Sequence, residues 1–289
     1  MLRMSRRGKT TDTFTESDDT PSLPRPGPIT ALRVLGQGFA VALPEHMDCT
    51  IGRAGPPVTD VQLLHPSISR LHALATQVPR GLLLSDLGSK NGLHSGDPWD
   101  RGEYHSCQRT LVHVGGRFAL GDVELLALDA ATEQLTALFT SYCGDGEWED
   151  VDRALEGAAR GHMLVLDGAR DGDLSTLARA IHGHSVRRDS PFMVIETIPS
   201  SPEGIERLCA AAGRGTIYLD LRARQAMPAQ LARYLFAPDC HVRAILVAQS
   251  PEEVVERFGP AIVDRPGARQ VCTVGFRRGD GGSNVEFFS

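Results

Sequence analysis

The sequence predicts a multi-domain protein in which an all-β sandwich is followed by a three-layer α/β domain. With 289 residues, 41% of them hydrophobic, the chain can form two compact domains that each bury a core. Between residues 29 and 130, short β-type runs alternate with turn residues, which is typical of an antiparallel sandwich. Over residues 131–278, strand-like and helix-like segments alternate, which predicts a parallel sheet covered by helices.

The two ends of the chain are expected to lie outside these domains. Residues 1–28 contain almost no large apolar side chains, so they predict a disordered tail rich in Thr, Asp and Pro. The tail ends in the proline-rich stretch Pro21–Pro28, which favours an extended linker. Residues 279–289 are expected to form a short C-terminal tail.

Seven strands are expected in the first domain, on apolar and β-branched runs between Gly, Pro and Asn turns. They are Ala31–Leu35, Phe39–Leu43, Cys49–Ile51, His72–Gln77, Leu82–Ser85, Thr110–Val114 and Val123–Leu128. No helical period interrupts the region, and this again favours an all-β fold.

Four short motifs in this region carry a family resemblance. They are Ile51-Gly52-Arg53, Ser69-Arg70-Leu71-His72, Asp86-Leu87-Gly88-Ser89-Lys90-Asn91-Gly92 and Phe118-x-Leu120-Gly121-Asp122-Val123-Glu124. In this order and spacing they resemble the FHA (forkhead-associated) family over about residues 30–129. The resemblance implies a phosphothreonine-binding site made by Arg53, Ser69, Arg70, Ser89, Lys90 and Asn91. It also implies that Gly52, His72 and Gly92 support the site, with His72 bracing a loop from behind.

These residue types suit the chemistry of a phosphorylated threonine. The phosphate carries a charge of roughly −1.5 to −2 and several acceptor oxygens. Arg53 and Arg70 offer planar guanidinium forks to such oxygens, and Ser69 offers a short hydroxyl donor. By the resemblance, Asn91 hydrogen-bonds the main chain of the ligand. An unphosphorylated threonine would leave two arginines unpaired and bind negligibly.

Two positions depart from the family pattern. Lys90 stands where a threonine is frequent, and it adds a cation near the expected phosphate. Leu93 stands where a threonine usually follows Asn91-Gly92. We expect Leu93 to change which ligand residue after the phosphothreonine is preferred.

The N-terminal tail suggests a ligand within the chain itself. Its candidate phosphorylation sites are Thr10, Thr11, Thr13 and Thr15, which lie beside acidic residues in a segment that a kinase could reach. One hypothesis is that a phosphorylated tail docks in the chain's own pocket, in cis or between copies. The alternative is a tail that only solubilises the chain.

The second domain is expected to contain alternating strands and helices. The expected strands are Met163–Leu166, Pro191–Glu196, Thr216–Asp220 and Val242–Ala248. The expected helices are Glu147–Arg160, Leu174–His182, Ser201–Ala212, Met227–Phe236 and Pro251–Phe258.

Part of this region resembles a known ATPase core. The segment Gly168–Ser175 reads as a phosphate loop, Thr176–His182 as the helix after it, and Gly215–Asp220 as a later strand. Together they resemble the AAA+ core of sigma-54-dependent transcriptional activators, most strongly over Leu166–Val194. The resemblance implies a P-loop-like fold, here truncated.

The residues that would do the chemistry are replaced. A phosphate loop presents backbone N–H groups and one lysine to the phosphates, but Leu174 occupies the lysine position. The acidic pair at the strand end is Asp220-Leu221, so the residue that would orient water is lost. We therefore predict a degenerate, inactive nucleotide site at Gly168, Gly172, Leu174 and Asp220. The protein is predicted to be a pseudo-ATPase and not an enzyme, with no cofactor.

Composition excludes several other classes. The net charge of −6 argues against direct DNA binding. The six cysteines are too far apart for a redox pair or a zinc knuckle, and His182-x-His184 has no metal-ligand partners, so no metal is expected. No signal peptide or membrane span is visible, which favours a cytoplasmic protein.

The sequence therefore predicts a phosphothreonine-dependent signalling adaptor. Its partner is expected to be a phosphorylated protein in a Ser/Thr kinase pathway, and the α/β domain is expected to be a protein-interaction scaffold. The alternative is a transcriptional regulator that acts through contacts with sigma-54 activator proteins and has no DNA-binding domain of its own.

Overall fold

A computed structural model gives the structure of the chain. It describes residues 27–45, 48–79, 81–96, 104–143, 146–161, 163–168, 174–185, 187–223, 229–235, 240–248 and 271–276, and the backbone of residues 15–16. The expected helix Pro251–Phe258 and the expected tail 279–289 lie outside these residues, as do Thr10, Thr11, Thr13 and Gly172.

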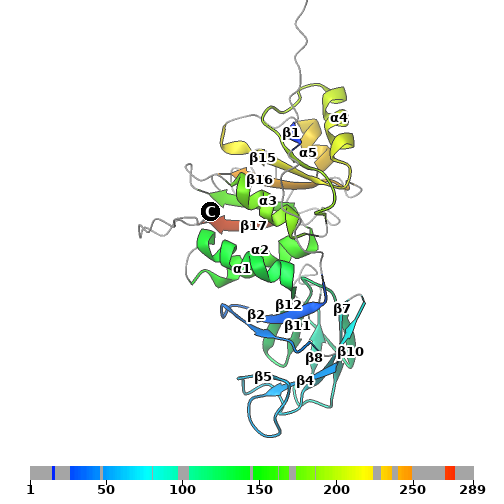
Figure 1. Cartoon of the computed structure of the whole chain (residues 1–289), viewed down its shortest axis with the longest axis vertical. Coiled ribbons are helices and arrows are strands. Elements are labelled where there is room, and N and C mark those ends of the chain that lie inside the picture. The colour runs from blue at the N-terminus through cyan, green and yellow to red at the C-terminus, as the bar shows by residue number, and fades with distance from the viewer. Residues whose placement is uncertain are drawn as a thin grey trace, which may run out of the picture.

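The first domain is a β-sandwich of two sheets (Figure 1). The five-stranded sheet has the order β10 (Arg109–Val112), β7 (Gly81–Asp86), β6 (Ala73–Val78), β4 (Asp48–Arg53) and β5 (Val61–Leu63). The six-stranded sheet has the order β3 (Phe39–Ala42), β2 (Ile29–Val34), β12 (Val123–Asp129), β11 (Arg117–Leu120), β8 (Leu93–Ser95) and β9 (His105–Cys107). All pairings are antiparallel except that of β4 with β5. The predicted antiparallel sandwich is confirmed, with this one parallel pair.

The core of the sandwich lies between the two sheets. It consists of side chains that alternate along the strands, among them Ile51, Leu82, Leu84 and Phe118, all fully buried. The seven strands predicted from apolar and β-branched runs between turn residues supply most of this core. Strands β5, β8, β9 and β11 were not predicted; the first three have only three residues each, and β11 has four.

The second domain is built on a parallel sheet. Its order is β14 (Phe192–Val194), β15 (Thr216–Asp220), β16 (Arg243–Ala248), β13 (Met163–Gly168) and β17 (Val271–Phe276). These five strands pair in parallel, and β1 (Thr15–Glu16) pairs antiparallel with β14 at the edge. Thr15 and Glu16 are thus in a strand, whereas the sequence predicted disorder throughout residues 1–28.

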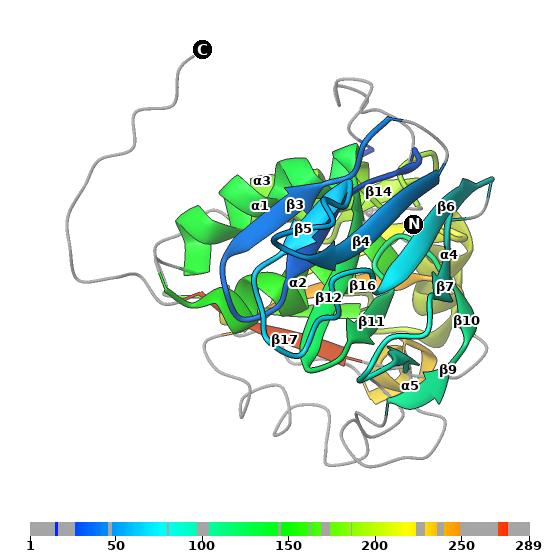
Figure 2. The same ribbon diagram turned by 90° about the horizontal axis from the view of Figure 1, so that it is seen from below.

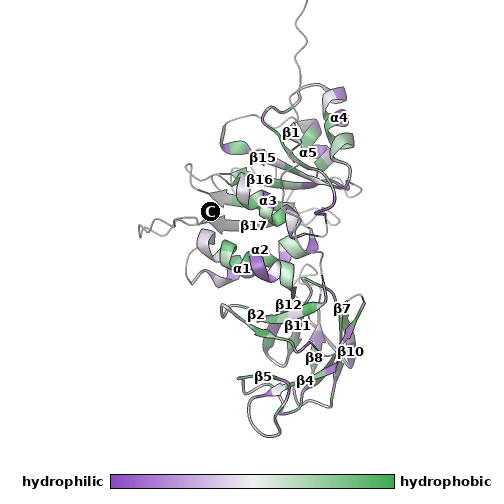
Figure 3. Ribbon diagram, viewed as in Figure 1, coloured by the Kyte–Doolittle hydropathy of each residue, from purple (hydrophilic) through white to green (hydrophobic). Residues whose placement is uncertain are grey.

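Helices cover both faces of this sheet. The helices are α1 (Ala130–Cys143), α2 (Trp148–Arg160), α3 (Ser175–Gly183), α4 (Pro202–Ala212) and α5 (Ala229–Leu235), and a short 3-10 turn, η1 (Leu221–Ala223), follows β15. One core cluster joins α1, α2 and α3 to one face, and another joins α4 and α5 to the other. The central strand β16 is buried along its whole length, as expected for a strand covered on both faces. Its sequence after Arg243 is hydrophobic throughout, and Figure 3 colours the ribbon by this hydropathy. The predicted three-layer α/β arrangement with a parallel sheet is confirmed.

Helix α1 was not predicted from the sequence. Its buried residues include Leu135, Phe139 and Cys143, which recur at helical spacing, but its three threonines lower the helix propensity. The residue before the helix gives the missing signal. Asp129 is fully buried, and its carboxylate accepts a hydrogen bond of 2.8 Å from the N–H of Thr132, as an N-cap does.

The two domains share a continuous core. Leu126 and Leu128 of β12 point away from the sandwich interior and pack with α1 and α2 in the same cluster that reaches β13. The molecule is therefore a stack of sandwich, helix pair, parallel sheet and outer helices, which Figure 1 shows from the side. Figure 2 views the same stack end-on, from the side of the sandwich.

Polar contacts reinforce this junction. Arg33 of β2 and Asp152 of α2 form an ion pair in which both side chains are at most 4% exposed. Asp152 also accepts a hydrogen bond of 2.7 Å from the N–H of Gly36, and the guanidinium of Arg33 lies 6.0 Å from the ring centre of Trp148. Helix α2 is thereby fixed to the turn between β2 and β3.

No helix in the described part of the chain is long and apolar enough to cross a membrane.

Candidate functional site

The predicted site residues lie on three adjoining segments at one end of the sandwich. These segments are the end of β4 with the loop to β5, the loop from β5 to β6, and the loop from β7 to β8. Backbone hydrogen bonds connect the segments. The N–H of Arg53 donates to the carbonyl oxygen of Ser69 at 2.9 Å, and the N–H of Leu87 donates to the carbonyl oxygen of His72 at 2.9 Å. The structure therefore brings all the segments that carry the predicted residues to one place.

Arg53 is the last residue of β4 and is half-buried. Its neighbour Gly52 allows the close approach of the next loop. A Cβ atom at Gly52 would lie 2.0 Å from the carbonyl oxygen of Arg70, a distance that real Cβ atoms do not reach. A glycine at position 52 is thus required for the strand that ends at Arg53 to lie against the loop that carries Ser69 and Arg70.

Ser69 stands between two of the loops. Its hydroxyl oxygen accepts a hydrogen bond of 2.9 Å from the N–H of Lys90. Because the oxygen accepts this bond, the hydroxyl proton remains available for another acceptor, such as an anion. The backbone N–H of Ser69 donates to Nδ1 of His72 at 3.1 Å.

His72 connects the loops from inside the domain. Its side chain is fully buried. Since Nδ1 accepts from Ser69, the ring proton is on Nε2, which lies 3.0 Å from the carbonyl oxygen of Gly92 and donates to it. The ring thus holds the loop of Ser69 against the loop of Gly92.

The loop between β7 and β8 is held by its own side chains. The hydroxyl of Ser89 accepts from the N–H of Gly92 at 2.9 Å, and the carboxylate of Asp86 accepts from the N–H of Ser89 at 3.3 Å. Gly92 has a φ of 82°, in the left-handed region that favours glycine. These bonds set the turn that presents Lys90 and Asn91 to solvent.

Two residues that the sequence analysis missed complete this scaffold, Ser67 and Asp86. The carbonyl oxygen of Ser67 accepts from the side-chain amide of Asn91 at 2.7 Å, and its hydroxyl accepts from the N–H of Asp122 at 3.0 Å. The sequence signal that could have identified Ser67 is its place directly after Pro66, where a small polar side chain is typical of a turn.

The electrostatics of the three segments favour an anion. Arg70 and Lys90 are exposed and Arg53 is half-buried. Within the described ranges, no ion pair involves the side chain of Arg53, Arg70 or Lys90. Three cations that are not neutralised, beside a hydroxyl donor, form an arrangement that can bind a multiply charged anion.

One sequence expectation about this site is wrong. Leu93 is fully buried in the sandwich core between the two sheets. It therefore does not reach a ligand and does not select the ligand residue that follows the phosphothreonine.

The residues of the predicted degenerate nucleotide site follow two parallel strands. Gly168 ends β13 and Asp220 ends β15, so both lie at the carboxyl edge of the sheet. Leu174 precedes α3 and is 3% exposed, within the core. Asp220 is ion-paired with Arg222 at 2.6 Å, and Leu221 is fully buried.

The histidines at the end of α3 are buried. His182 is 4% exposed, and its Nδ1 lies 2.9 Å from the hydroxyl of Thr216. Burial, and next the charge of Arg243, lower the pKa of His182 to about 4. The ring is therefore neutral at physiological pH.

Three buried thiols are protonated at neutral pH. Burial raises the pKa of Cys49 to about 11 and the pKa of Cys143 and Cys209 to about 12. Because the thiolate is the nucleophilic form, these three cysteines are unreactive in the folded protein.

Comparison with known families identifies the first domain. Residues 49–121 match the family model described as FHA domain, and this part of the chain is an FHA domain. The match does not extend to the C-terminal region, so the resemblance to sigma-54 activators stays a prediction. A comparison with curated proteins finds no match.

Solved structures also resemble this part of the chain. The FHA domain of the CT664 protein from Chlamydia trachomatis is 28% identical, with a TM-score of 0.29, over 34% of this chain and 95% of that one. EmbR from Mycobacterium tuberculosis, solved in complex with a low affinity phosphopeptide, is 22% identical, with a TM-score of 0.29, over 35% and 24%. The yeast Dun1 FHA domain, in complex with a doubly phosphorylated (pT) peptide, is 22% identical, with a TM-score of 0.27, over 44% and 84%.

Proposed function

We propose that this chain is a phosphothreonine-dependent signalling adaptor. The FHA domain binds a phosphorylated threonine of a partner protein in a Ser/Thr kinase pathway, at Arg53, Ser69, Arg70, Ser89, Lys90 and Asn91. The observation that carries the proposal is the set of three cations that are not ion-paired in the described structure, on loops joined by hydrogen bonds through Ser69 and His72.

The chemistry of the site accounts for a requirement for the phosphate. Hydrogen bonds to charged groups contribute about 1.5–3 kcal/mol each, so three of them supply roughly 5–9 kcal/mol gross. Ordering a flexible peptide costs several kcal/mol, which leaves an affinity on the order of micromolar. A ligand without the phosphate gives the three cations no counter-charge. Its binding free energy therefore lacks the contribution of these charged hydrogen bonds.

Preorganisation supports the same proposal. The loop positions are fixed by hydrogen bonds to a buried ring and to backbone groups, so the binding groups need little reordering when a ligand arrives. The hydroxyl of Ser69, which already accepts from Lys90, is left with its proton for a phosphate oxygen.

For the α/β domain, we propose an ATPase-like scaffold without hydrolysis. The strand order β14-β15-β16-β13-β17, with β16 between β13 and β15, is neither of the two common doubly wound orders and agrees with the AAA+ resemblance. Two further observations support the absence of catalysis. Leu174 and Leu221 are core residues, and Asp220 is already paired with Arg222 instead of being available to a metal ion.

A peptide array tests the binding function. The full chain is applied to peptides that each carry phosphothreonine, phosphoserine, threonine or glutamate at one fixed position among varied flanks. We expect retention on phosphothreonine peptides alone, and its loss after phosphatase treatment of the array. Equal retention on the unmodified peptides would contradict the proposal.

An ATPase assay tests the second part. We expect no phosphate release above the background of a denatured sample. Hydrolysis that survives purification and is lost in an Asp220→Ala variant would show that the domain is an enzyme.

A further inference from the structure

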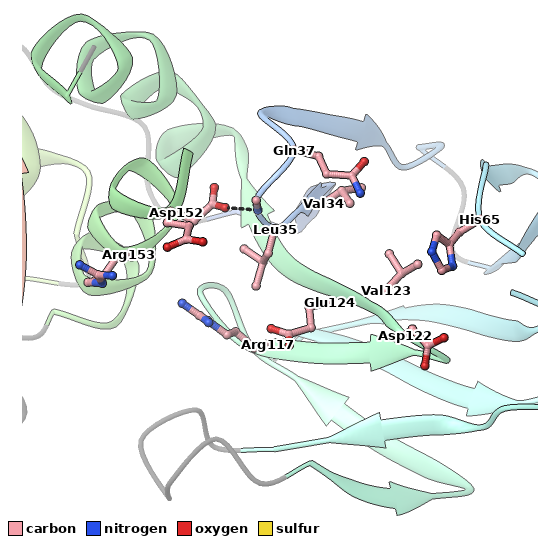
Figure 4. A pocket seen from close by; sticks show the side chains of 12 residues that line it. Val34, Leu35, Gln37, His65, Arg117, Asp122, Val123, Glu124, Asp152 and Arg153 are labelled. Carbon is pink, nitrogen blue, oxygen red and sulfur yellow. Dashed lines mark hydrogen bonds between the residues drawn. The ribbon is translucent and has the colours of Figure 1, made fainter. Parts of the chain in front are cut away.

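A groove lies between the sandwich and helix α2, beside the candidate phosphothreonine site (Figure 4). Its volume is about 440 Å³. Its walls come from the β2–β3 turn, the β5–β6 loop, the β11–β12 hairpin and the first turns of α2. Figure 4 shows it running from Asp152 on α2, past Leu35 and Glu124, to Asp122 and His65.

The cations that line the groove are already neutralised. Arg117 is bound to Glu156 at 2.7 Å, and Arg153 to Asp150 at 3.0 Å. Neither Glu156 nor Asp150 lines the groove. Each arginine thus uses its charge on a carboxylate outside the groove and offers little to an anion inside it.

The carboxylates that line the groove are not balanced in the same way. Asp122, Glu124 and Glu149 are exposed. In the described part of the structure, no ion pair involves any of the three, and the carboxylate of Glu124 accepts a hydrogen bond of 3.0 Å from the hydroxyl of Tyr104. Burial, and next the charge of Glu124, raises the pKa of the Tyr104 hydroxyl well above its ordinary value. The groove therefore has an excess of negative charge.

One loop forms a wall of both sites. His65 lines the groove, whereas Ser69 and Arg70, a few residues later, belong to the candidate phosphothreonine site. Ser67 stands between them: its hydroxyl accepts from the N–H of Asp122 at the groove, and its carbonyl accepts from Asn91 at the binding site. The groove and the candidate binding site are thus joined through this one loop.

We propose that this groove is a second subsite for the phosphothreonine ligand, and that it takes a lysine or arginine side chain of the ligand. This inference rests on the proposed function of the FHA domain. His65 and Ser69 are four positions apart, a span of at most about 14 Å, so the basic residue lies roughly four or five positions from the phosphothreonine. Glu149 belongs to the α/β domain, so both domains of this chain contribute to recognition of the partner.

The expected effect is moderate, because the carboxylates are exposed. Each exposed charge pair contributes about a two- to fivefold gain in affinity at low salt. Glu149 on α2 and Asp122 on the β11–β12 hairpin lie toward opposite ends of the groove, so one basic side chain gains from one of them at a time. A single lysine is therefore expected to raise the affinity about two- to fivefold, and this gain decreases as the salt concentration rises.

The experiment is a titration of the full chain with phosphothreonine peptides. In one series a single lysine is moved along both flanks against a glutamine background, and the affinity is measured by fluorescence anisotropy. The variants are Glu149→Gln and Asp122→Asn, alone and together. Glu206→Gln is the matched control, because Glu206 is an exposed glutamate on α4 that does not line the groove.

The outcomes separate this inference from the proposed function. We expect one lysine position to raise the affinity about two- to fivefold, and the double variant to remove that gain while binding the glutamine peptide as the unaltered chain does. If the phosphothreonine peptides bind but no lysine position gains affinity, or if the gain persists in the double variant, the subsite is wrong and the FHA function stands. If no phosphothreonine peptide binds, the proposed function fails, and this inference fails with it.

Discussion

Ser69 connects the loops of the candidate site, and we propose that its hydroxyl also donates to the ligand. Only the first role can be read directly from the structure. A change that removes the hydroxyl and keeps the backbone separates them, because the N–H of Ser69 continues to donate to His72.

We predict that Ser69→Ala lowers the affinity for a phosphothreonine peptide by roughly ten- to a hundredfold, the value of one hydrogen bond to a charged group. The free energy of unfolding is expected to fall by only about 1 kcal/mol, for the lost bond to Lys90. Calorimetric titration and urea unfolding measure the two quantities. Ser69→Thr keeps the hydroxyl and is expected to restore binding, and equal affinity of the alanine variant would remove Ser69 from the site.

At the residue scale, the sequence predicted which segments carry the site, but it did not predict the hydrogen bonds that hold these segments in place. Arg53, Ser69 and Lys90 could be named because charged and hydroxyl residues stood in motifs of fixed spacing. Ser67 and Asp86 could not, because their contacts with Asn91 and Ser89 depend on how two loops fold against each other. Leu93 was misassigned because a position in a motif does not tell which face of a strand it occupies.

At the scale of elements, α2 is fixed to β2 by the buried pair Arg33–Asp152. We predict that Asp152→Asn lowers the free energy of unfolding by about 3–5 kcal/mol, because it leaves the Arg33 charge buried without a counter-charge. Asp150→Asn on the same helix is the matched control, since Asp150 pairs with Arg153 near the surface and its loss is expected to cost at most about 1 kcal/mol. Chemical unfolding of both variants gives the comparison, and equal losses would show that the buried pair has no special role.

The end of α3 gives a prediction about pH. His182 is neutral in the folded protein because burial lowers its pKa to about 4, from the ordinary 6.5 expected in the unfolded chain. As the pH falls from about 6.5 to about 4, the unfolded chain gains a proton that the folded chain does not, so the free energy of unfolding falls by on the order of 3 kcal/mol at most.

Unfolding curves measured at several pH values test this prediction. In His182→Gln the decline between pH 6.5 and 4 is expected to be shallower than in the unaltered chain. A decline of the same size in both proteins would assign it to other groups.

The elements also show what limits prediction from a sequence. Seven strands of the sandwich and the helices α2 to α4 have clear sequence patterns, so both their type and their place were predicted. Strands β5, β8, β9 and β11 were missed. Helix α1 was missed because its threonines and short apolar pattern resemble a loop until Asp129 is recognised as its N-cap. The junction between the domains could not be predicted, because nothing in the sequence pairs Arg33 with a residue 119 positions away.

At the scale of the whole molecule, the shared core of the two domains has a consequence for unfolding. The side chains of β12, α1, α2 and β13 form one cluster, so neither domain can unfold without exposing part of the other. We predict a single unfolding transition, with coincident curves from far-UV circular dichroism and from fluorescence.

Ligand binding is expected to raise the midpoint of this single transition, because both domains unfold together. A phosphothreonine peptide at 100 times its Kd adds about 2.7 kcal/mol to the free energy of unfolding. If the sandwich and the α/β domain instead unfold in two separate transitions, and the peptide shifts only the first, the junction is not a cooperative unit.

The central claim is that cationic and hydroxyl groups on three loops bind a phosphate on threonine. The most direct test is calorimetric titration of the full chain and of Arg53→Ala with one peptide in its phosphothreonine and threonine forms. The account predicts an affinity on the order of micromolar for the phosphothreonine form with the unaltered chain, and no measurable binding in the other three combinations. Binding of the phosphothreonine peptide to Arg53→Ala with unchanged affinity, while its fold is intact, would contradict the account.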